Sequence, residues 1–113
     1  MLPKKMKFER VEPTLAFDPL TIHPGEILFV EFMEPYGVSI NRLAKMTRVA
    51  TMTISRIVNG KRGITAETSI RLGKCFRMSD NFFLNIQEEY DIRVAKAKIS
   101  NLDEVEVLAA LED

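Results

Sequence analysis

Several features are scarce or missing in this chain of 113 residues, and each excludes a class of protein. Cys75 is the only cysteine, so no disulfide can form within the chain, which is typical of a reducing compartment. No apolar run approaches the roughly 20 residues that a membrane-spanning helix needs. The basic start lacks the apolar core of a secretory signal. We therefore expect a soluble cytoplasmic protein in which Cys75 is a small core residue.

Histidine is equally scarce, because His23 is the only one. Catalysis by a nucleophile and a base, or binding of a metal, needs several convergent side chains. His23 has no cluster of cysteine, histidine or aspartate near it in the sequence, and there is no glycine-rich phosphate loop. We expect no enzyme, no metal and no cofactor, and we interpret His23 as a structural residue at the start of a helix.

Acidic residues are almost absent from residues 39–77, although the formal net charge of the whole chain is zero. This stretch holds nine basic residues and one acidic residue, Glu67, so its net charge is +8. A local excess of positive charge is the electrostatic footprint of phosphate binding. A domain that bound only proteins would not need this bias, so nucleic acid is the favoured partner.

Residues 39–60 within this basic stretch read as two short helices joined by a tight turn. Ser39 is placed to cap the first helix and Thr51 to cap the second, and Gly60 offers a left-handed stop. The inward residues recur at helical spacing in both halves: Leu43, Ala44, Thr47, Ile54, Ile57 and Val58. This is the helix-turn-helix arrangement, in which the second helix lies in the major groove of DNA.

The outward face of the second predicted helix suits base recognition. Arginine can contact guanine with two hydrogen bonds, hydroxyl groups can donate or accept, and methyl groups can meet the thymine methyl. Any amphipathic helix needs a polar face, but the charge of residues 39–77 favours DNA. The outward residues are Thr51, Met52, Ser55 and Arg56, with Thr53 nearer the edge.

Three further helices are expected, which gives an all-α fold of five helices. They cover residues 24–34, 65–77 and 80–98, with Pro24 at the first helical position, Thr65 and Ser79 as N-caps, and Pro35 and Gly37 ending the first. The expected organisation is an N-terminal arm over 1–22, a domain over 23–98 and a short acidic tail over 99–113. The tail could form a short strand or a short helix.

The first predicted helix carries more apolar residues than one face can bury. Leu28, Phe29, Val30 and Phe32 wrap most of the way round a helix, because successive residues are about 100° apart. Something should cover Phe29 and Val30. We expect the chain's own arm to pack there, and the alternative is that the patch and the arm together bind a partner.

Several motifs resemble those of the HigA (VapI-like) antitoxins, a branch of the phage-repressor-like helix-turn-helix proteins. They are HPGEIL at 23–28, ISRIVNGKRGIT at 54–65 and FFLNIQEEYDIRVA at 82–95, and the resemblance covers residues 23–98. It implies a compact five-helix domain that binds palindromic operator DNA as a homodimer and represses its own operon. It also implies a partner toxin, a HigB-like ribonuclease, that the protein neutralises; the alternative is a transcriptional regulator with no toxin partner.

Matched by position, the resemblance implies base contacts from the outward residues of the second helix and phosphate contacts from Asn59 and Lys61. Arg48 stands where the family usually has glycine, so we expect it to adopt a positive φ at a cost of about 1 kcal/mol. The dimer contact is expected over residues 82–94 or in the tail. The full predicted DNA-binding set is Arg48, Thr51, Met52, Thr53, Ser55, Arg56, Asn59 and Lys61.

Overall fold

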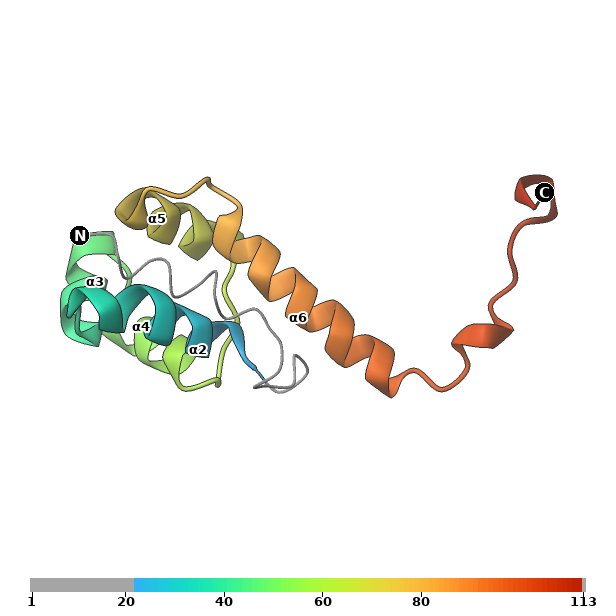
Figure 1. Cartoon of the computed structure of the whole chain (residues 1–113), viewed down its shortest axis with the longest axis horizontal. Helices are drawn as coiled ribbons and strands as arrows, with labels where there is room; N and C mark the ends of the chain where they lie inside the picture. Colours follow the sequence, from blue (N-terminus) through green and yellow to red (C-terminus); the bar gives the residue numbers. More distant parts are fainter. Residues whose placement is uncertain (1–21, 113) are drawn as a thin grey trace.

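The computed structural model describes residues 22–112, and every regular element in that range is a helix (Figure 1). In chain order the elements are α2 (Pro24–Ile27), η2 (Leu28–Met33), η3 (Glu34–Tyr36), α3 (Ile40–Thr47), α4 (Thr51–Val58), α5 (Ala66–Phe76), α6 (Phe82–Lys98), η4 (Leu102–Glu104) and η5 (Ala109–Leu111). The predicted all-α fold of five helices is confirmed, with α2, η2 and η3 together as the first helix. The predicted arm lies outside the described residues except for Ile22.

The first helix begins as predicted but is less regular than expected. His23 is its N-cap, Pro24 occupies the first helical position and Glu26 lies in the first turn, where its charge suits the helix dipole. The helix then widens into the π-helix η2 and tightens into the 3₁₀ helix η3. It therefore continues two residues past the predicted end at residue 34, and it ends at Gly37, which has a φ of 66°.

The π-helix brings three large side chains of one short segment into the core. Leu28, Phe32 and Met33 are each at least 97% buried, whereas Phe29 and Val30 are only partly buried. A π turn has a different residue spacing from an α turn, since its hydrogen bonds join residues five apart. The sequence predicted that one face of this helix cannot bury all of its apolar residues, and the structure agrees. The arm that we expected to cover the remainder lies outside the described residues.

The core lies where the first helix, the helix-turn-helix pair and the start of α6 meet. Leu43, Ile54, Ile57 and Leu72 are fully buried and come from α3, α4 and α5. Four rings then join the first helix to α5 and α6: centroid distances of 5.0–6.1 Å connect Phe32, Phe76, Phe82 and Phe83. Tilted and edge-on ring pairs of this kind are favourable beyond the area they bury.

Two of the predicted helix caps are confirmed. The Ser39 hydroxyl accepts a hydrogen bond from the Arg42 N–H at 3.1 Å, and the Thr65 hydroxyl accepts one from the Thr68 N–H at 3.3 Å. Each satisfies a backbone donor that has no partner within its helix. Helices α3 and α5 therefore each begin with a side-chain N-cap. They precede and follow α4, the second helix of the helix-turn-helix, which we call the recognition helix.

The other two predicted caps are wrong. Helix α4 begins one residue earlier than expected, with Ala50 as its N-cap, so Thr51 is the first helical residue and its hydroxyl does not cap. Helix α6 begins after Asn81, two residues later than predicted, because residues 79–81 form a turn in which the Ser79 hydroxyl contacts the Asn81 side chain at 3.1 Å. The chain needs this turn to reverse direction after α5.

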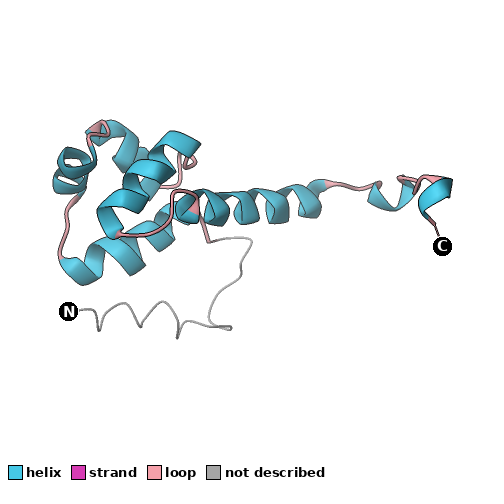
Figure 2. Cartoon of the chain, turned by 90° about the horizontal axis from the view of Figure 1, so that it is seen from above, coloured by secondary structure: helices cyan, strands magenta, loops and turns pink. Residues whose placement is uncertain are grey.

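Helix α6 starts in the core and then leaves it. Figures 1 and 2 show that its second half and the tail extend away from the other helices. The tail was expected to be a short strand or a short helix, and it contains two 3₁₀ turns, η4 and η5, joined by extended residues. All residues from 99 to 112 are exposed.

One glycine sets how closely the first helix approaches the recognition helix. Gly25 is buried, and a Cβ placed on it would overlap the carbonyl group of Ile57 and crowd Val58 at the end of α4. Only a residue without a side chain allows this distance between the two backbones. The start of the first helix therefore supports the end of the recognition helix directly.

Gly25→Ala should lower the free energy of unfolding by roughly 3 kcal/mol, at the upper end of the range for overpacking, because the added methyl meets backbone atoms that cannot rotate away. Gly37→Ala is the matched control. Its φ is 66° but no atom lies within 4 Å of the added methyl, so we expect a loss of roughly 1 kcal/mol from backbone strain alone. Urea unfolding followed by circular dichroism measures both. Equal losses would contradict the close approach.

Candidate nucleic-acid interface

Helices α3 and α4 cross through a three-residue turn of the kind that the sequence predicted. Ala44 is 4% exposed at the crossing, and Val49 is partly buried and packs against the core. Arg48 has a φ of 61° and a ψ of 38°, so the predicted left-handed conformation of this arginine is confirmed. Its side chain is exposed.

A second arginine stabilises the turn between α3 and α4 through a hydrogen bond from α5. Arg71 on α5 donates from Nη1 to the Thr47 carbonyl at 3.1 Å and from Nε to the Glu67 carboxylate at 3.1 Å. The Thr47 hydroxyl in turn donates to the Leu43 carbonyl at 2.7 Å. The end of α3 thereby gains hydrogen-bond donors for its carbonyl groups, and the buried Thr47 hydroxyl has a hydrogen-bond partner.

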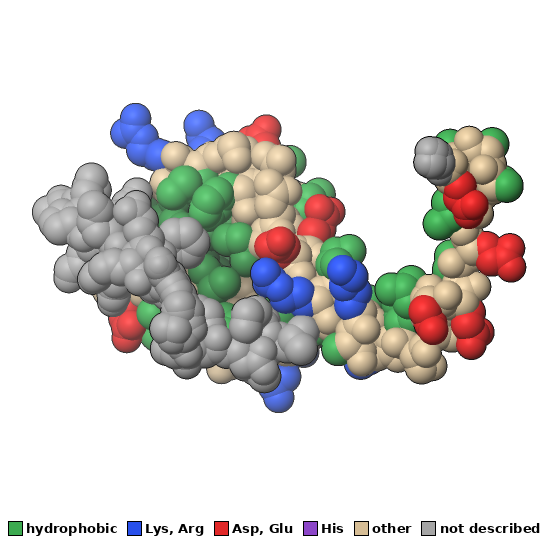
Figure 3. All heavy atoms as spheres, turned by 45° about the vertical axis from the view of Figure 1, so that its right-hand side comes forward, with side chains coloured by type: hydrophobic (Ala, Val, Ile, Leu, Met, Phe, Trp, Pro, Cys, Tyr) green, Lys and Arg blue, Asp and Glu red, His purple; other side chains and the backbone are tan. Residues whose placement is uncertain are grey.

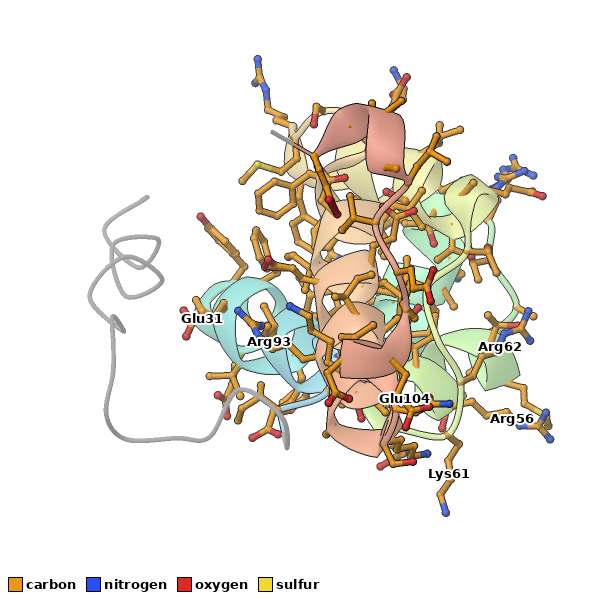
Figure 4. The ribbon with its side chains drawn as sticks, turned by 90° about the vertical axis from the view of Figure 1, so that its right-hand side faces the viewer. Glu31, Arg56, Lys61, Arg62, Arg93 and Glu104 are labelled. Carbon is orange, nitrogen blue, oxygen red and sulfur yellow. The ribbon has the colours of Figure 1, made fainter. Side chains whose placement is uncertain are left out.

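The exposed face of α4 carries the residues that were predicted to face DNA bases. Thr51, Met52 and Arg56 are exposed, with Met52 at 60%, whereas Thr53 and Ser55 are partly buried. Figure 4 shows the Arg56 side chain pointing away from the body of the protein. Because α4 has an alanine N-cap, the Thr51 hydroxyl is also left free to point outward.

The C-terminal end of α4 is capped by the residues that directly follow it in the chain. Gly60 has a φ of 73°, and the Lys61 N–H donates to the Arg56 carbonyl at 2.8 Å. This bond and the left-handed glycine are the features of a Schellman motif, which confirms Gly60 as the stop. The Asn59 amide nitrogen donates to the Ser55 carbonyl at 2.8 Å and contacts its hydroxyl at 3.4 Å. Asn59 therefore has a capping role besides the predicted phosphate contact.

The basic loop after α4 is fixed by a residue that the predicted set did not include. Gln87 on α6 is buried, accepts a hydrogen bond from the Ile64 N–H at 2.8 Å and donates to Asp91 at 3.0 Å. A Cβ on Gly63 would lie 3.0 Å from the side-chain amide of Gln87, so any side chain at this position would crowd Gln87. The signal was present in the sequence, because Gln87 lies within the motif at 82–95.

Arg62 was also missing from the predicted set. It is exposed, and Figure 4 shows it on the same side of the domain as Arg56, with Lys61 extending from the same loop. The structure thus brings together a base-reading helix face and a basic loop on one side of the domain. Only the fold places Arg62 on the same side of the domain as Arg56.

His23 links the first helix, α6 and the end of α4. Its Nδ1 accepts a hydrogen bond from the Gly25 N–H at 2.9 Å, and its ring packs edge-on against Tyr90 with centroids 5.1 Å apart. Its ring atoms also lie about 4 Å from the position of a Cβ on Gly60. Burial lowers the pKa of His23, and the neighbouring acids Asp91 and Glu26 oppose this shift. The neutral ring can therefore accept the capping hydrogen bond.

Residues 22–112 contain no group of three histidine, cysteine or acidic side chains that could hold a metal ion. Within the same residues, no helix combines the length and apolar character needed to cross a membrane. Cys75 is partly buried beside the core, and burial raises the pKa of its thiol. These findings leave the surface formed by α4 and the following loop as the candidate functional site.

Two crossing helices, an exposed second helix with base-reading side chains and an adjoining basic loop define a helix-turn-helix DNA-binding domain. Comparison with known proteins agrees, because the helix-turn-helix family model matches residues 31–83. The chain belongs to the HigA-type (VapI-like) antitoxin family of helix-turn-helix proteins, as the following relatives establish.

Virulence-associated protein I of Dichelobacter nodosus is 44% identical over 75 residues, which are 66% of this chain and 69% of that protein. Antitoxin HigA-1 of Vibrio cholerae is 38% identical over 60% of this chain and 64% of its own length. Among solved structures, a Pseudomonas aeruginosa protein in complex with its 18-bp operator DNA is 40% identical, with a TM-score of 0.73 over 77% of this chain and 96% of that one. The P. aeruginosa antitoxin HigA with the higBA promoter has a TM-score of 0.65 at 39% identity, over 72% and 97%.

Arg48→Gly should raise the free energy of unfolding by a few tenths to about 1 kcal/mol, because glycine adopts the left-handed conformation without strain. Arg42→Gly is a control within the helical part of α3, where glycine should instead lower stability by about 1 kcal/mol. Thermal and urea unfolding check both variants. A lower stability of Arg48→Gly would show that contacts of the arginine side chain outweigh its backbone strain.

Proposed function

We propose that this protein is a sequence-specific operator-binding repressor of its own operon, acting in the cytoplasm without enzymatic activity. The observation that carries the proposal is the exposed face of α4, where Thr51, Met52 and Arg56 point outward beside the basic loop of Lys61 and Arg62. The side chains of α4 suit base edges, and the loop suits phosphates on either side of the groove.

A single helix of eight residues reads only a few base pairs, so we propose that the protein binds a palindromic operator as a homodimer. Two-fold symmetry would place the half-sites about 34–36 Å apart or a multiple of that distance. Support comes from relatives whose structures contain operator DNA, including antitoxin GraA in complex with its operator at 35% identity and a TM-score of 0.69. In this proposal Arg48, Thr53, Ser55 and Asn59 keep the roles predicted from the sequence.

We further propose that the protein neutralises a toxin, a HigB-like ribonuclease. The support is that relatives are named antitoxin or addiction module antidote protein, including one from Coxiella burnetii that is 44% identical. A regulator without a toxin partner is the second candidate. It is favoured by relatives such as YbaQ of Escherichia coli, 38% identical over 61% of either chain, which is named only as a helix-turn-helix transcriptional regulator.

Arg56→Ala should weaken operator binding by roughly 1–3 kcal/mol and relax base preference at one position of each half-site, since a side chain that reads a base is lost. Lys61→Ala should weaken binding to all sequences equally and lower the slope of log K against log salt by about 1. Fluorescence anisotropy with operator and scrambled duplexes at several salt concentrations measures both. Equal losses on the two duplexes for Arg56→Ala would make Arg56 a phosphate contact.

If the toxin proposal holds, the tagged protein should co-purify with the product of the adjacent reading frame and suppress its ribonuclease activity. The control is the Arg56→Ala variant, which changes a surface assigned to DNA and should retain the toxin. Co-expression followed by affinity purification and an mRNA-cleavage assay measures both effects. An adjacent frame whose product is neither bound nor inhibited would favour the regulator without a toxin.

A further inference from the structure

The C-terminal tail, residues 99–112, carries exposed apolar side chains. Five large ones are between 50% and 75% exposed: Leu102, Val105, Val107, Leu108 and Leu111. Figures 1 and 2 show the tail extending from the far end of α6, away from the other helices. An apolar surface concentrated in one short segment marks a site of interaction.

The tail is also acidic throughout. It contains Asp103, Glu104, Glu106 and Glu112, and no lysine or arginine follows Lys98 in the chain. Figure 3 shows hydrophobic and acidic side chains next to one another along it. Val105 and Leu108 have extended backbone dihedrals, and Glu106 lies between Val105 and Val107 in the chain. The segment thus combines exposed apolar side chains with negative charge.

The domain carries a groove that is also apolar but is bordered by positive charge. It lies between the ends of the first helix, α3 and α5. The groove has a volume of about 550 Å³ and is lined mainly by apolar side chains, among them Phe32, Tyr36, Met46, Cys75 and Phe76. A neighbouring hollow of about 330 Å³ shares two of these residues, Met46 and Cys75, and so extends the apolar strip past the end of α3. Met46 is 51% exposed and Tyr36 is 40% exposed.

Four cations line this strip: Arg77 in the groove, and Arg48, Arg71 and Lys74 in the neighbouring hollow. Arg48 lies in the turn between α3 and α4 and Arg71 is hydrogen-bonded to that turn, whereas Lys74 and Arg77 lie at the end of α5, and both of these are exposed. Within residues 22–112 neither is among the ion pairs, which join Arg71 to Glu67 and Arg93 to Glu89. Arg77 also occupies a left-handed position, with a φ of 62°, where glycine would be less strained. We name the strip with Lys74 and Arg77 the basic-edged groove.

We propose that the tail of a second copy of this chain binds in the basic-edged groove. The apolar side chains of the tail match the lining of the groove, and its carboxylates match Lys74 and Arg77. In a two-fold dimer the contact would be made twice, once by each tail. It uses none of the DNA-facing residues of α4, although Arg48 of the predicted DNA-binding set lines the neighbouring hollow.

The direction of α6 favours a second copy over the chain's own groove. Helix α6 begins close to α5, six residues after Phe76, and its 17 residues carry the start of the tail about 26 Å away. A tail that returned to its own groove would have to run back along the whole helix. This inference rests on the dimer of the proposed function and names the contact that forms it.

The single native cysteine allows a direct test, because Cys75 lines both parts of the groove. One protein is the wild type. The other carries a larger affinity tag, Cys75→Ser, and a cysteine in the tail at one of three positions: Val105→Cys, Leu108→Cys or Leu111→Cys. The two are mixed, oxidised with copper phenanthroline and separated on a non-reducing gel. A disulfide of mixed mass can form only between the tail of one chain and the groove of another.

We expect at least one tail position to give the mixed disulfide in high yield, and Asn85→Cys in the same tagged background, on the exposed face of α6, to give little. Three results would overturn the proposal. These are no mixed disulfide at any tail position, tail-to-tail disulfides alone, or, when Cys75 is kept in the tail variants, a disulfide closed within one chain. The last result would place the tail in its own groove.

Charge reversal provides the second measurement. Lys74→Glu with Arg77→Glu should raise the dimer dissociation constant about tenfold or more, as expected when close charge pairs at an interface become repulsive. Adding Glu104→Lys and Glu106→Lys should restore most of the affinity. Arg62→Glu, on the DNA-facing side, is the matched control and should leave dimerisation unchanged. A loss that the tail changes do not restore, or an equal loss in the control, would contradict the proposal.

Sedimentation equilibrium of the wild type distinguishes failure of the proposed homodimer from failure of the tail contact alone. A monomer at working concentration would remove the dimer of the proposed function and this contact with it. A dimer that binds operator but gives no mixed disulfide would remove only the tail contact. Such a dimer would leave the tail for a different partner, such as the toxin.

Discussion

The close approach of the first helix to the end of the recognition helix is the constraint on which the rest of the structure depends. Gly25 lies against the Ile57 carbonyl with no room for a side chain between them. His23, two residues earlier, caps the first helix and packs on Tyr90 of α6. One short segment therefore fixes the recognition helix relative to both the first and the last helix of the domain.

Buried polar contacts then fix the parts of the DNA-binding surface that hydrophobic packing leaves free. Arg71 holds the turn before α4 through the Thr47 carbonyl, and Gln87 holds the loop after α4 through the Ile64 N–H. Ser69 joins α5 to α6, because its hydroxyl donates to the Asp80 carbonyl at 2.7 Å and accepts from the Leu84 N–H at 2.9 Å. These hydrogen bonds are directional, so they set positions that apolar contacts alone would not specify.

The domain separates its surfaces by function. The exposed face of α4 and the basic loop carry side chains suited to DNA, whereas the basic-edged groove lies between the ends of α3 and α5. Of the nine basic residues between 39 and 77, three lie on α5 or at its end and not on α4 or the loop that follows it. Arg71 supports the turn, and Lys74 and Arg77 border the groove. The net charge of +8 over this stretch correctly indicated a nucleic-acid-binding protein. Contrary to what the sequence had suggested, however, the basic residues do not all lie on one surface.

The sequence by itself determined the helices, most of their ends and the outward face of α4, because helical periodicity and N-caps such as Ser39 are local properties. The left-handed conformation of Arg48 was implied only by the family resemblance. The structure decided what depends on contacts distant in sequence. The π-helix of residues 28–33 brings Leu28, Phe32 and Met33 together into the core, and no local pattern predicts it. Gln87 reaches a loop 23 residues earlier, and this hydrogen bond helps to place the basic loop on the same side of the domain as Arg56. Such pairings form when burial and hydrogen bonding act between elements, so only the folded chain contains them.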